Sequence, residues 1–125
     1  MKSLTERQVE VLHKFGILIV FADSQNIRVI LTAFIRTAEE QNVLFRRGLS
    51  KCDGYINLSK HQQRLAFDIV ILNADWKPIN DYGDAPEYKV LGAEWERLGG
   101  HWGGGAGFAA AGFHDVFHFQ AGPAD

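Results

Sequence analysis

The segment from Ala66 to Leu72 constrains the fold of this chain more than any other. It reads Ala-Phe-Asp-Ile-Val-Ile-Leu, so a single carboxylate, Asp68, stands inside an otherwise apolar run. The β-branched residues favour a buried strand, and strand alternation puts Asp68 on the same face as Val70 and Leu72. An unpaired carboxylate there would cost several kcal/mol. We therefore expect it to meet a cation, a metal ion or strong hydrogen-bond donors.

The rest of the chain shows helical and strand patterns in mixed order. Ser3 and Glu6 form the pattern of a capping box ahead of the first helix, and Thr37 is the expected N-cap of the second. The remaining segments, 51–58, 73–86 and the glycine-rich 103–112, are predicted as loops, the last one flexible or tightly turned. These patterns predict an α+β fold, with helices packed on one face of a small, largely antiparallel sheet. Helices are predicted at 4–22, 38–48 and 87–98, and strands at 27–34, 66–72 and 116–120.

The composition is that of a single compact domain covering residues 1–125. The net charge of -2 gives no reason to expect nucleic acid or an anionic membrane as a partner. Cys52 is the single cysteine, so the fold does not depend on an internal disulfide. The N-terminal segment does not resemble a secretory signal, and the apolar run 17–22 is far shorter than the roughly 20 residues that span a bilayer. We therefore expect synthesis in the cytoplasm and no membrane insertion.

Two histidines and two carboxylates form a set that fits a catalytic metal centre. Taken alone, His118 between two phenylalanines would be a structural histidine, and Asp68 could form an ion pair or cap a turn. His61, however, lies seven residues before Asp68, and Asp115 lies three residues before His118. Catalytic zinc takes three His or carboxylate ligands and leaves one position open, with a further carboxylate to accept a proton. The same ligand set also suits iron, so spacing does not choose the metal. His101 and His114 flank this set and are predicted to be peripheral.

Four segments resemble motifs of the M15 zinc peptidases. That family comprises D-alanyl-D-alanine carboxypeptidases and dipeptidases and the phage L-alanyl-D-glutamate endopeptidases. The segments occur in the family's order and extend from Phe34 to Gln120. They are Phe34 to Gln41, similar to Arg-Thr-x-x-Glu-Gln; Ser59 to Asp68, similar to Ser-x-His-x(6)-Asp; Leu98 to Gly104, similar to Gly-x-x-Trp-Gly-Gly; and Asp115 to Gln120, similar to acidic-x-x-His-aromatic-Glu/Gln.

The resemblance implies a hedgehog/DD-peptidase-like fold and a role for each motif residue. Asp115 would be the general base and later the acid, and Arg36 would hold substrate or the developing oxyanion, which suits its permanently charged fork of donors. The metal ligands for Zn²⁺ would be His61, Asp68 and His118, and substrate contacts would come from Arg36, Ser59, Gln41 and Trp102. The chain departs from the family pattern at three positions. Arg64 stands where many members have glycine, Phe117 where proline is frequent, and Gln120 where glutamate is an alternative.

The function implied by the resemblance is hydrolysis of peptidoglycan stem peptides by a zinc-dependent peptidase. The first expectation is an L-alanyl-D-glutamate endopeptidase of the phage endolysin type, a monomer that acts on the cell wall after release from the cytoplasm. One alternative is a D-alanyl-D-alanine carboxypeptidase or dipeptidase, and another is a non-catalytic zinc-containing module that binds the cell wall. Retention of Asp115 argues against the last, because a structural metal site needs no base.

Overall fold

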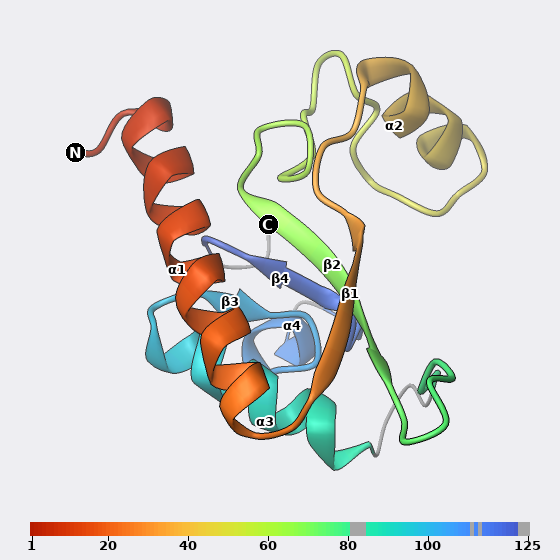
Figure 1. The fold of residues 1–125 in the computed structure, drawn as a ribbon. Helices are drawn as coiled ribbons and strands as arrows, with labels where there is room; N and C mark the ends of the chain where they lie inside the picture. Colours follow the sequence, from red (N-terminus) through yellow and green to blue (C-terminus); the bar gives the residue numbers. More distant parts are fainter. Residues whose placement is uncertain (81–84, 111, 113, 123–125) are drawn as a thin grey trace.

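The computed structural model describes residues 1–80, 85–110, 112 and 114–122 (Figure 1). Residues 81–84 of the loop predicted at 73–86, and residue 111 of the glycine-rich segment, lie outside the described residues. Helices and strands alternate one by one along the described part of the chain. They are α1 (Leu4–Ser24), β1 (Arg28–Ala33), α2 (Ala38–Arg46), β2 (Ala66–Leu72), α3 (Pro86–Arg97), β3 (His101–Trp102), α4 (Ala106–Ala110) and β4 (His118–Gln120).

The four strands form one antiparallel sheet in the order β1-β2-β4-β3. β2 pairs with β1 along most of its length and with β4 near its beginning, where Asp68 lies opposite His118. The register of β1 shifts between Leu31 and Ala33, so that Ala33 also lies opposite Asp68. The first half of β2 is thus central in the sheet.

Local sequence signals explain where the first two helices begin. The Ser3 hydroxyl accepts a hydrogen bond from the Glu6 amide, and the Glu6 carboxylate accepts one from the Ser3 amide. Thr37 and Glu40 form the same reciprocal pair ahead of α2. Each capping box satisfies amide groups that have no partner inside the helix. Both capping predictions are therefore confirmed, although α2 ends at Arg46, two residues before the predicted stop.

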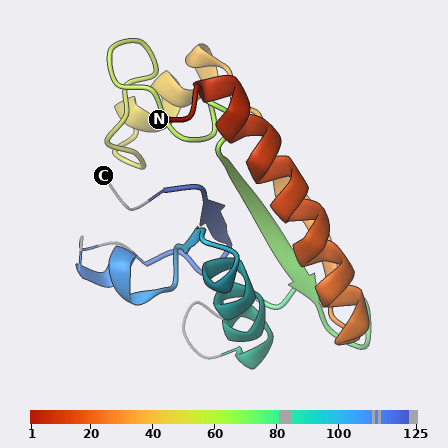
Figure 2. The same cartoon turned by 90° about the vertical axis from the view of Figure 1, so that its left-hand side faces the viewer.

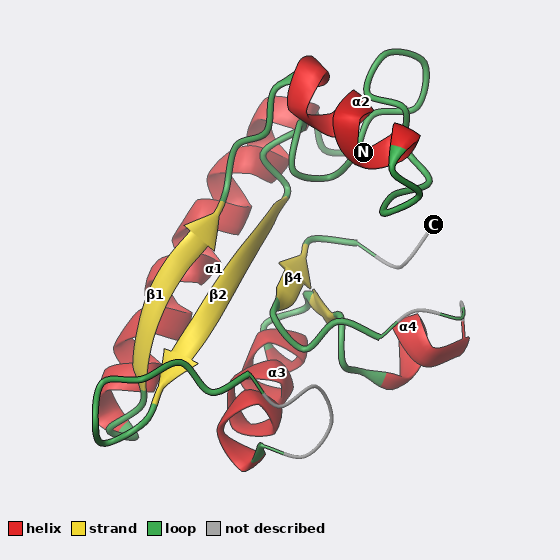
Figure 3. Cartoon of the chain, turned by 90° about the vertical axis from the view of Figure 1, so that its right-hand side faces the viewer, coloured by secondary structure: helices red, strands yellow, loops and turns green. Residues whose placement is uncertain are grey.

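The hydrophobic core lies between one face of the sheet and the helices α1 and α3. Phe67 of β2 is fully buried there, and its ring makes edge contacts with Phe15 of α1 and Trp95 of α3. Figure 2 shows α1 running alongside β2, and Figure 3 shows β1 and β2 in front of α1. The predicted α+β architecture is confirmed, while α2 stands beyond the end of the sheet (Figure 1).

The second half of the chain differs from the prediction in three elements. The two-residue strand β3 was not predicted, since two residues are too few to show a period. The segment predicted as flexible or tightly turned contains the short helix α4, in which Phe108 is buried. The last strand begins at His118 and not at Val116, because Val116 and Phe117 form a turn. The Val116 carbonyl in this turn accepts a hydrogen bond from the Trp102 indole N–H at 2.8 Å.

None of the helices in the described part of the chain combines the length and the apolar character needed to span a membrane.

Two helical glycines provide a matched test of the packing between α3 and β3. A Cβ added to Gly92 would lie 2.1 Å from the Trp102 ring, whereas one added to Gly16 would meet nothing within 4 Å. We predict that Gly92→Ala lowers the free energy of unfolding by about 1–3 kcal/mol through overpacking. Gly16→Ala should raise it by about 0.5–1 kcal/mol, because alanine is the better helix former. Urea unfolding of both variants measures the difference, and equal effects would contradict the packing described.

Candidate metal centre

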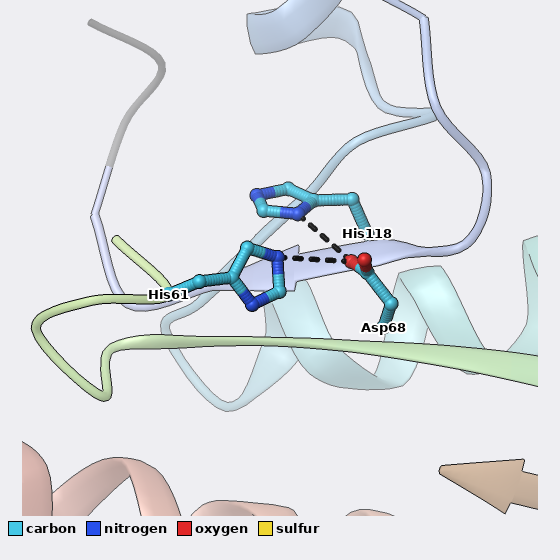
Figure 4. A group of neighbouring side chains, drawn as sticks. All are labelled: His61, Asp68 and His118. Atoms are coloured by element: carbon cyan, nitrogen blue, oxygen red, sulfur yellow. Dashed lines mark hydrogen bonds and ion pairs between the residues drawn. The ribbon is translucent and has the colours of Figure 1, made fainter. Parts of the chain in front are cut away.

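Three side chains from two strands and a turn meet at the beginning of β2. The Asp68 carboxylate oxygen Oδ1 lies 3.3 Å from His61 Nε2 and 3.1 Å from His118 Nδ1 (Figure 4). One ligand atom from each residue lies within 4.8 Å of the others. Within the described residues, this is the single group of three or more such side chains that could hold a metal ion. The structure therefore brings together the three residues predicted as ligands.

His61 is held by a helical turn that begins at Ser59. The Ser59 hydroxyl accepts a hydrogen bond from the Gln62 amide at 3.2 Å, and Gln62 Oε1 accepts one from the Ser59 amide at 3.0 Å. The turn ends at Arg64, whose φ of 56° is a left-handed conformation that glycine adopts without strain. Ser59 lines the cavity, but its hydroxyl already caps the turn that carries His61.

The outward-facing nitrogen of each histidine lies near an acceptor. His61 Nδ1 lies 3.4 Å from the Phe34 carbonyl, and His118 Nε2 lies 2.8 Å from Gln120 Oε1. The Gln120 amide is oriented by a 2.8 Å hydrogen bond from its Nε2 to the Gly122 carbonyl. Metal-binding histidines in proteins have an acceptor of this kind behind them, which fixes the tautomer. Glutamine at position 120 therefore still offers an acceptor oxygen.

A neutral imidazole cannot donate to acceptors on both of its sides. His118 lies between the Asp68 carboxylate and Gln120 Oε1, so it needs either a second proton or a metal ion on Nδ1. Burial lowers the pKa of His118, but hydrogen bonds to Asp68 and Gln120, with the charges of Asp68 and Asp115, outweigh it and raise this pKa. A divalent cation in place of that proton satisfies the same atoms, so the donor set fits a metal.

The carboxylate of Asp68 is stabilised in its charged form. Burial raises the pKa of Asp68, but hydrogen bonds from His118 and His61 outweigh burial and hold this pKa well below its ordinary value. An ionised carboxylate and two imidazoles are the oxygen and nitrogen ligands that zinc takes in catalytic sites. The sequence predicted that the Asp68 carboxylate would meet a cation, a metal ion or strong hydrogen-bond donors. The two histidines are those partners.

Asp115 lies in the loop before β4 and lines the same cavity as the three residues. Its carboxylate accepts a hydrogen bond from the Phe117 amide at 3.1 Å, and its backbone carbonyl accepts one from the His118 amide at 3.1 Å. Burial and then the charge of Asp68 raise the pKa of Asp115. A raised carboxyl pKa moves the group toward the range in which it can both accept and return a proton.

Arg36 also lines this cavity, and Gln41 holds it in place from behind. Arg36 Nη1 donates to Gln41 Oε1 at 2.8 Å, while Gln41 Nε2 donates to Ser50 Oγ at 2.7 Å and to the Cys52 carbonyl at 2.9 Å. Gln41 is 0% exposed, so its amide is engaged inside the protein. The structure thus places Gln41 where it orients Arg36, and its predicted substrate contact is not seen in the lining of the cavity.

Trp102 is not brought together with the other predicted residues. Its side chain is 8% exposed, packs over Gly92 and lines a separate cavity of about 270 Å³ with Tyr88 and His114. Trp102 anchors the turn before His118 through its indole N–H bond to Val116. It therefore supports the backbone of the site rather than the cavity wall.

Several residues around the site were not predicted from the sequence. Phe108 of α4 is buried with its ring centroid 5.7 Å from that of His118, and nothing in the glycine-rich sequence around it indicated such a contact. The cavity has a volume of about 230 Å³. Besides the residues already placed, its walls include Leu44, Leu49, Ser50, Lys51, Cys52, Lys60 and Phe108.

No family model matches the sequence, and no curated protein is significantly similar to it in sequence. Solved structures do share its fold. The L-Ala D-Glu endopeptidase ChiX of Serratia marcescens matches with a TM-score of 0.58 and 20% identity over 75% of this chain. The LD-carboxypeptidase LdcB matches with a TM-score of 0.61 and 16% identity over 89%. A mutant of the vancomycin resistance D,D-pentapeptidase VanY, in complex with Zn(II), matches with a TM-score of 0.60 and 15% identity over 90%.

These likenesses show that the chain shares the fold of ChiX, LdcB and VanY. The matches span 66%, 56% and 71% of ChiX, LdcB and VanY, respectively, so each of those chains has parts without a counterpart here. The expected DD-peptidase-like fold is therefore confirmed.

The acceptor behind His118 gives a test of the metal centre. We predict that Gln120→Ala weakens zinc binding by about 10–100-fold, because the histidine loses the group that fixes its tautomer. Gln120→Glu, which keeps an acceptor oxygen, should bind zinc at least as well as the wild type. Competition with a chromophoric chelator measures both affinities. Gln25→Ala, at the exposed end of α1, is the control and should leave the affinity unchanged.

The buried amide of Gln41 gives a second test. Gln41→Leu should lower the free energy of unfolding by about 1–3 kcal/mol, because buried groups that bonded to the amide lose their partner. The Arg36 guanidinium should also lose its fixed position in the cavity wall. Thermal unfolding measures the first effect, and a crystal structure of the variant shows the second. A variant that loses stability yet keeps Arg36 in place would show that Gln41 does not orient Arg36.

Proposed function

We propose that this protein is a zinc-dependent peptidase that hydrolyses the stem peptides of peptidoglycan, as an L-alanyl-D-glutamate endopeptidase. The observation that carries the proposal is the convergence of His61, Asp68 and His118, each histidine with an acceptor at its outer nitrogen, in a cavity that Asp115 also lines. The fold shared with ChiX, LdcB and VanY supports the substrate class.

Zinc, when bound, would supply Lewis acidity next to the peptide carbonyl. The other steps belong to residues of the chain. Asp115, with its raised pKa, would take a proton from the attacking water and pass it to the leaving amine. Its position is defined by backbone hydrogen bonds on both sides, from Phe117 to its carboxylate and from its own amide to the Gly103 carbonyl. Such anchoring keeps the carboxylate turned toward the cavity.

Arg36 would bind the negative charge that develops on the substrate carbonyl, or a substrate carboxylate. Its guanidinium has one nitrogen bonded to Gln41 and keeps further donors for a ligand in the cavity. Donors that are already in place before the reaction stabilise developing charge without a cost of reorganisation.

A second candidate is a D-alanyl-D-alanine carboxypeptidase or dipeptidase. The observation in its favour is that Lys51 and Lys60 line the cavity together with Arg36, so that cations surround the position of a bound peptide. A terminal carboxylate would be bound well by such a wall.

A non-catalytic zinc module that binds the cell wall has less support. Asp115 lines the cavity and has a raised pKa, and a structural metal site needs no such group.

The proposed role of Asp115 is tested by Asp115→Asn, which keeps the shape of the side chain. We expect zinc content to match the wild type and muropeptide release from purified cell wall to fall by about 10²–10⁴-fold. Asp23→Asn, an exposed carboxylate at the end of α1, is the matched control and should digest at the wild-type rate. If Asp115→Asn binds zinc and digests cell wall as the wild type does, the catalytic assignment fails.

Mass spectrometry of the wild-type digest distinguishes the two candidate reactions. New L-alanine carboxyl termini are the product expected of the endopeptidase. Released D-alanine without such termini would exclude the endopeptidase and support the carboxypeptidase.

A further inference from the structure

One face of the paired strands β1 and β2 extends from the candidate metal centre to the other end of the strands. The helices α1 and α3 do not cover this face. Alternation along β2 puts Asp68, Val70 and Leu72 on this face, opposite the side that carries the buried Phe67. On β1, Ile30 lies opposite Val70 and is 45% exposed. Figure 3 looks onto this part of the sheet with α1 behind it. The result is a partly exposed apolar strip that begins at Asp68.

An exposed tryptophan lies at the far end of this strip. Trp76 is 66% exposed, and the Arg28 guanidinium lies over one face of its ring, 4.0 Å from the centroid. Arg28 is itself held by hydrogen bonds from Nη1 to the Asn73 and Ala74 carbonyls, both at 3.1 Å. Since Arg28 lies opposite Leu72 in the sheet, the stacked pair continues the strip. With one ring face covered by Arg28, the exposed area of the indole belongs to its edges and opposite face.

The turn that carries Trp76 is tied down by hydrogen bonds. Asn73 Oδ1 accepts from the Asp75 amide at 2.9 Å and from the Lys77 amide at 3.1 Å, and the Trp76 amide donates to the Asn73 carbonyl at 3.0 Å. Trp76 has a φ of 61°, a left-handed conformation that bulky residues rarely adopt. A large apolar side chain is thus presented to solvent by a rigid, strained turn, which is a combination found at binding sites.

We propose that Trp76 is a stacking platform for a sugar ring of the glycan strand to which the stem peptide is attached. The proposal rests on the function proposed above. A flat indole with one face backed by a guanidinium offers the other face to the C–H side of a pyranose ring, a contact that needs no charge on the ligand. The apolar strip from Asp68 to Leu72 then runs beneath the part of the substrate between sugar and scissile bond.

The strip along β2 is long enough to reach from the candidate metal centre to a sugar ring. Four residues of strand separate Asp68 from Leu72, a distance of roughly 13 Å. The stem begins with L-alanine on the lactyl group of the sugar. The L-alanyl-D-glutamate bond therefore lies about one to two extended residues, or roughly 4–7 Å, from the ring that carries the stem. The next ring of the strand lies farther out, toward Trp76. A bond about four residues along the stem lies roughly 13–14 Å from that ring, so the ring that carries the stem would then itself reach Trp76.

The test measures binding at each of the three tryptophans separately. Trp95 and Trp102 have buried indole N–H groups that donate to the Gln120 and Val116 carbonyls, so Trp76 is the one that a surface ligand can reach directly. The zinc-supplemented protein is titrated with glycan fragments from which the stem peptides have been removed, and the indole N–H resonances are followed by NMR. The Trp76 resonance should shift with saturation, while those of Trp95 and Trp102 stay in place.

Variants at this position separate ring stacking from loss of fold. Trp76→Asn removes the ring but tolerates the left-handed backbone, and it should weaken glycan binding by about tenfold or more. Trp76→Tyr keeps an aromatic face and should retain most of the affinity. Val20→Ala, on the exposed side of α1, is the control and should bind as the wild type. Unshifted Trp95 and Trp102 resonances in each variant show that the core is intact.

Three results would overturn the proposal. These are an unshifted Trp76 resonance, wild-type affinity in Trp76→Asn, and an equal shift of Trp76 with free stem peptide that carries no sugar. The last would assign the platform to a peptide. Cell-wall digestion by the wild type is measured in parallel. Digestion without glycan binding at Trp76 removes this inference alone, and no digestion by zinc-loaded wild type removes the proposed function.

Discussion

The pairing of β2 with β4 determines both the core and the candidate site. It places Asp68 opposite His118, fifty positions later in the chain, and Phe67 opposite Phe119. The two phenylalanine rings stack in the core at 5.3 Å, while the aspartate and histidine face the cavity. Because side chains alternate, a slip of one residue would turn Phe119 toward the cavity and His118 toward the core. Burial of Phe67 and Phe119 therefore holds Asp68 and His118 in register.

The backbone around Asp115 is tied to the same strand. The Gly103 amide donates to the His118 carbonyl at 2.7 Å, and the Asp115 amide donates to the Gly103 carbonyl at 3.0 Å. A Cβ on Gly103 would lie 2.1 Å from the Asp115 carbonyl oxygen, so this close approach requires glycine. On the core side, the Trp102 indole N–H donates to the Val116 carbonyl, next to Asp115 in the chain. Asp115 and His118 thus share one rigid support, although neither Gly103 nor Trp102 lines the cavity.

The sequence was informative where one residue contradicted its surroundings. Asp68 in an apolar strand predicted a side chain that needs partners, and the structure supplies His61 and His118. Alternation and capping patterns were sufficient for β2 and for the starts of α1 and α2. Trp102 and Gln41 could not be placed from the sequence, because the position of each depends on contacts with another segment of the chain. Trp102 was predicted to contact substrate, but its ring packs over Gly92. Gln41 was also predicted to contact substrate, but its amide bonds to Ser50 and to the Cys52 carbonyl.

The central claim is that His61, Asp68 and His118 hold the metal. A crystal of the zinc-loaded protein, measured on both sides of the zinc absorption edge, tests it directly. We predict an anomalous difference peak bounded by His61 Nε2, the Asp68 carboxylate and His118 Nδ1, with His118 Nε2 still facing Gln120. A zinc peak at another place in the protein, or full zinc loading without a peak between these three side chains, would contradict the claim.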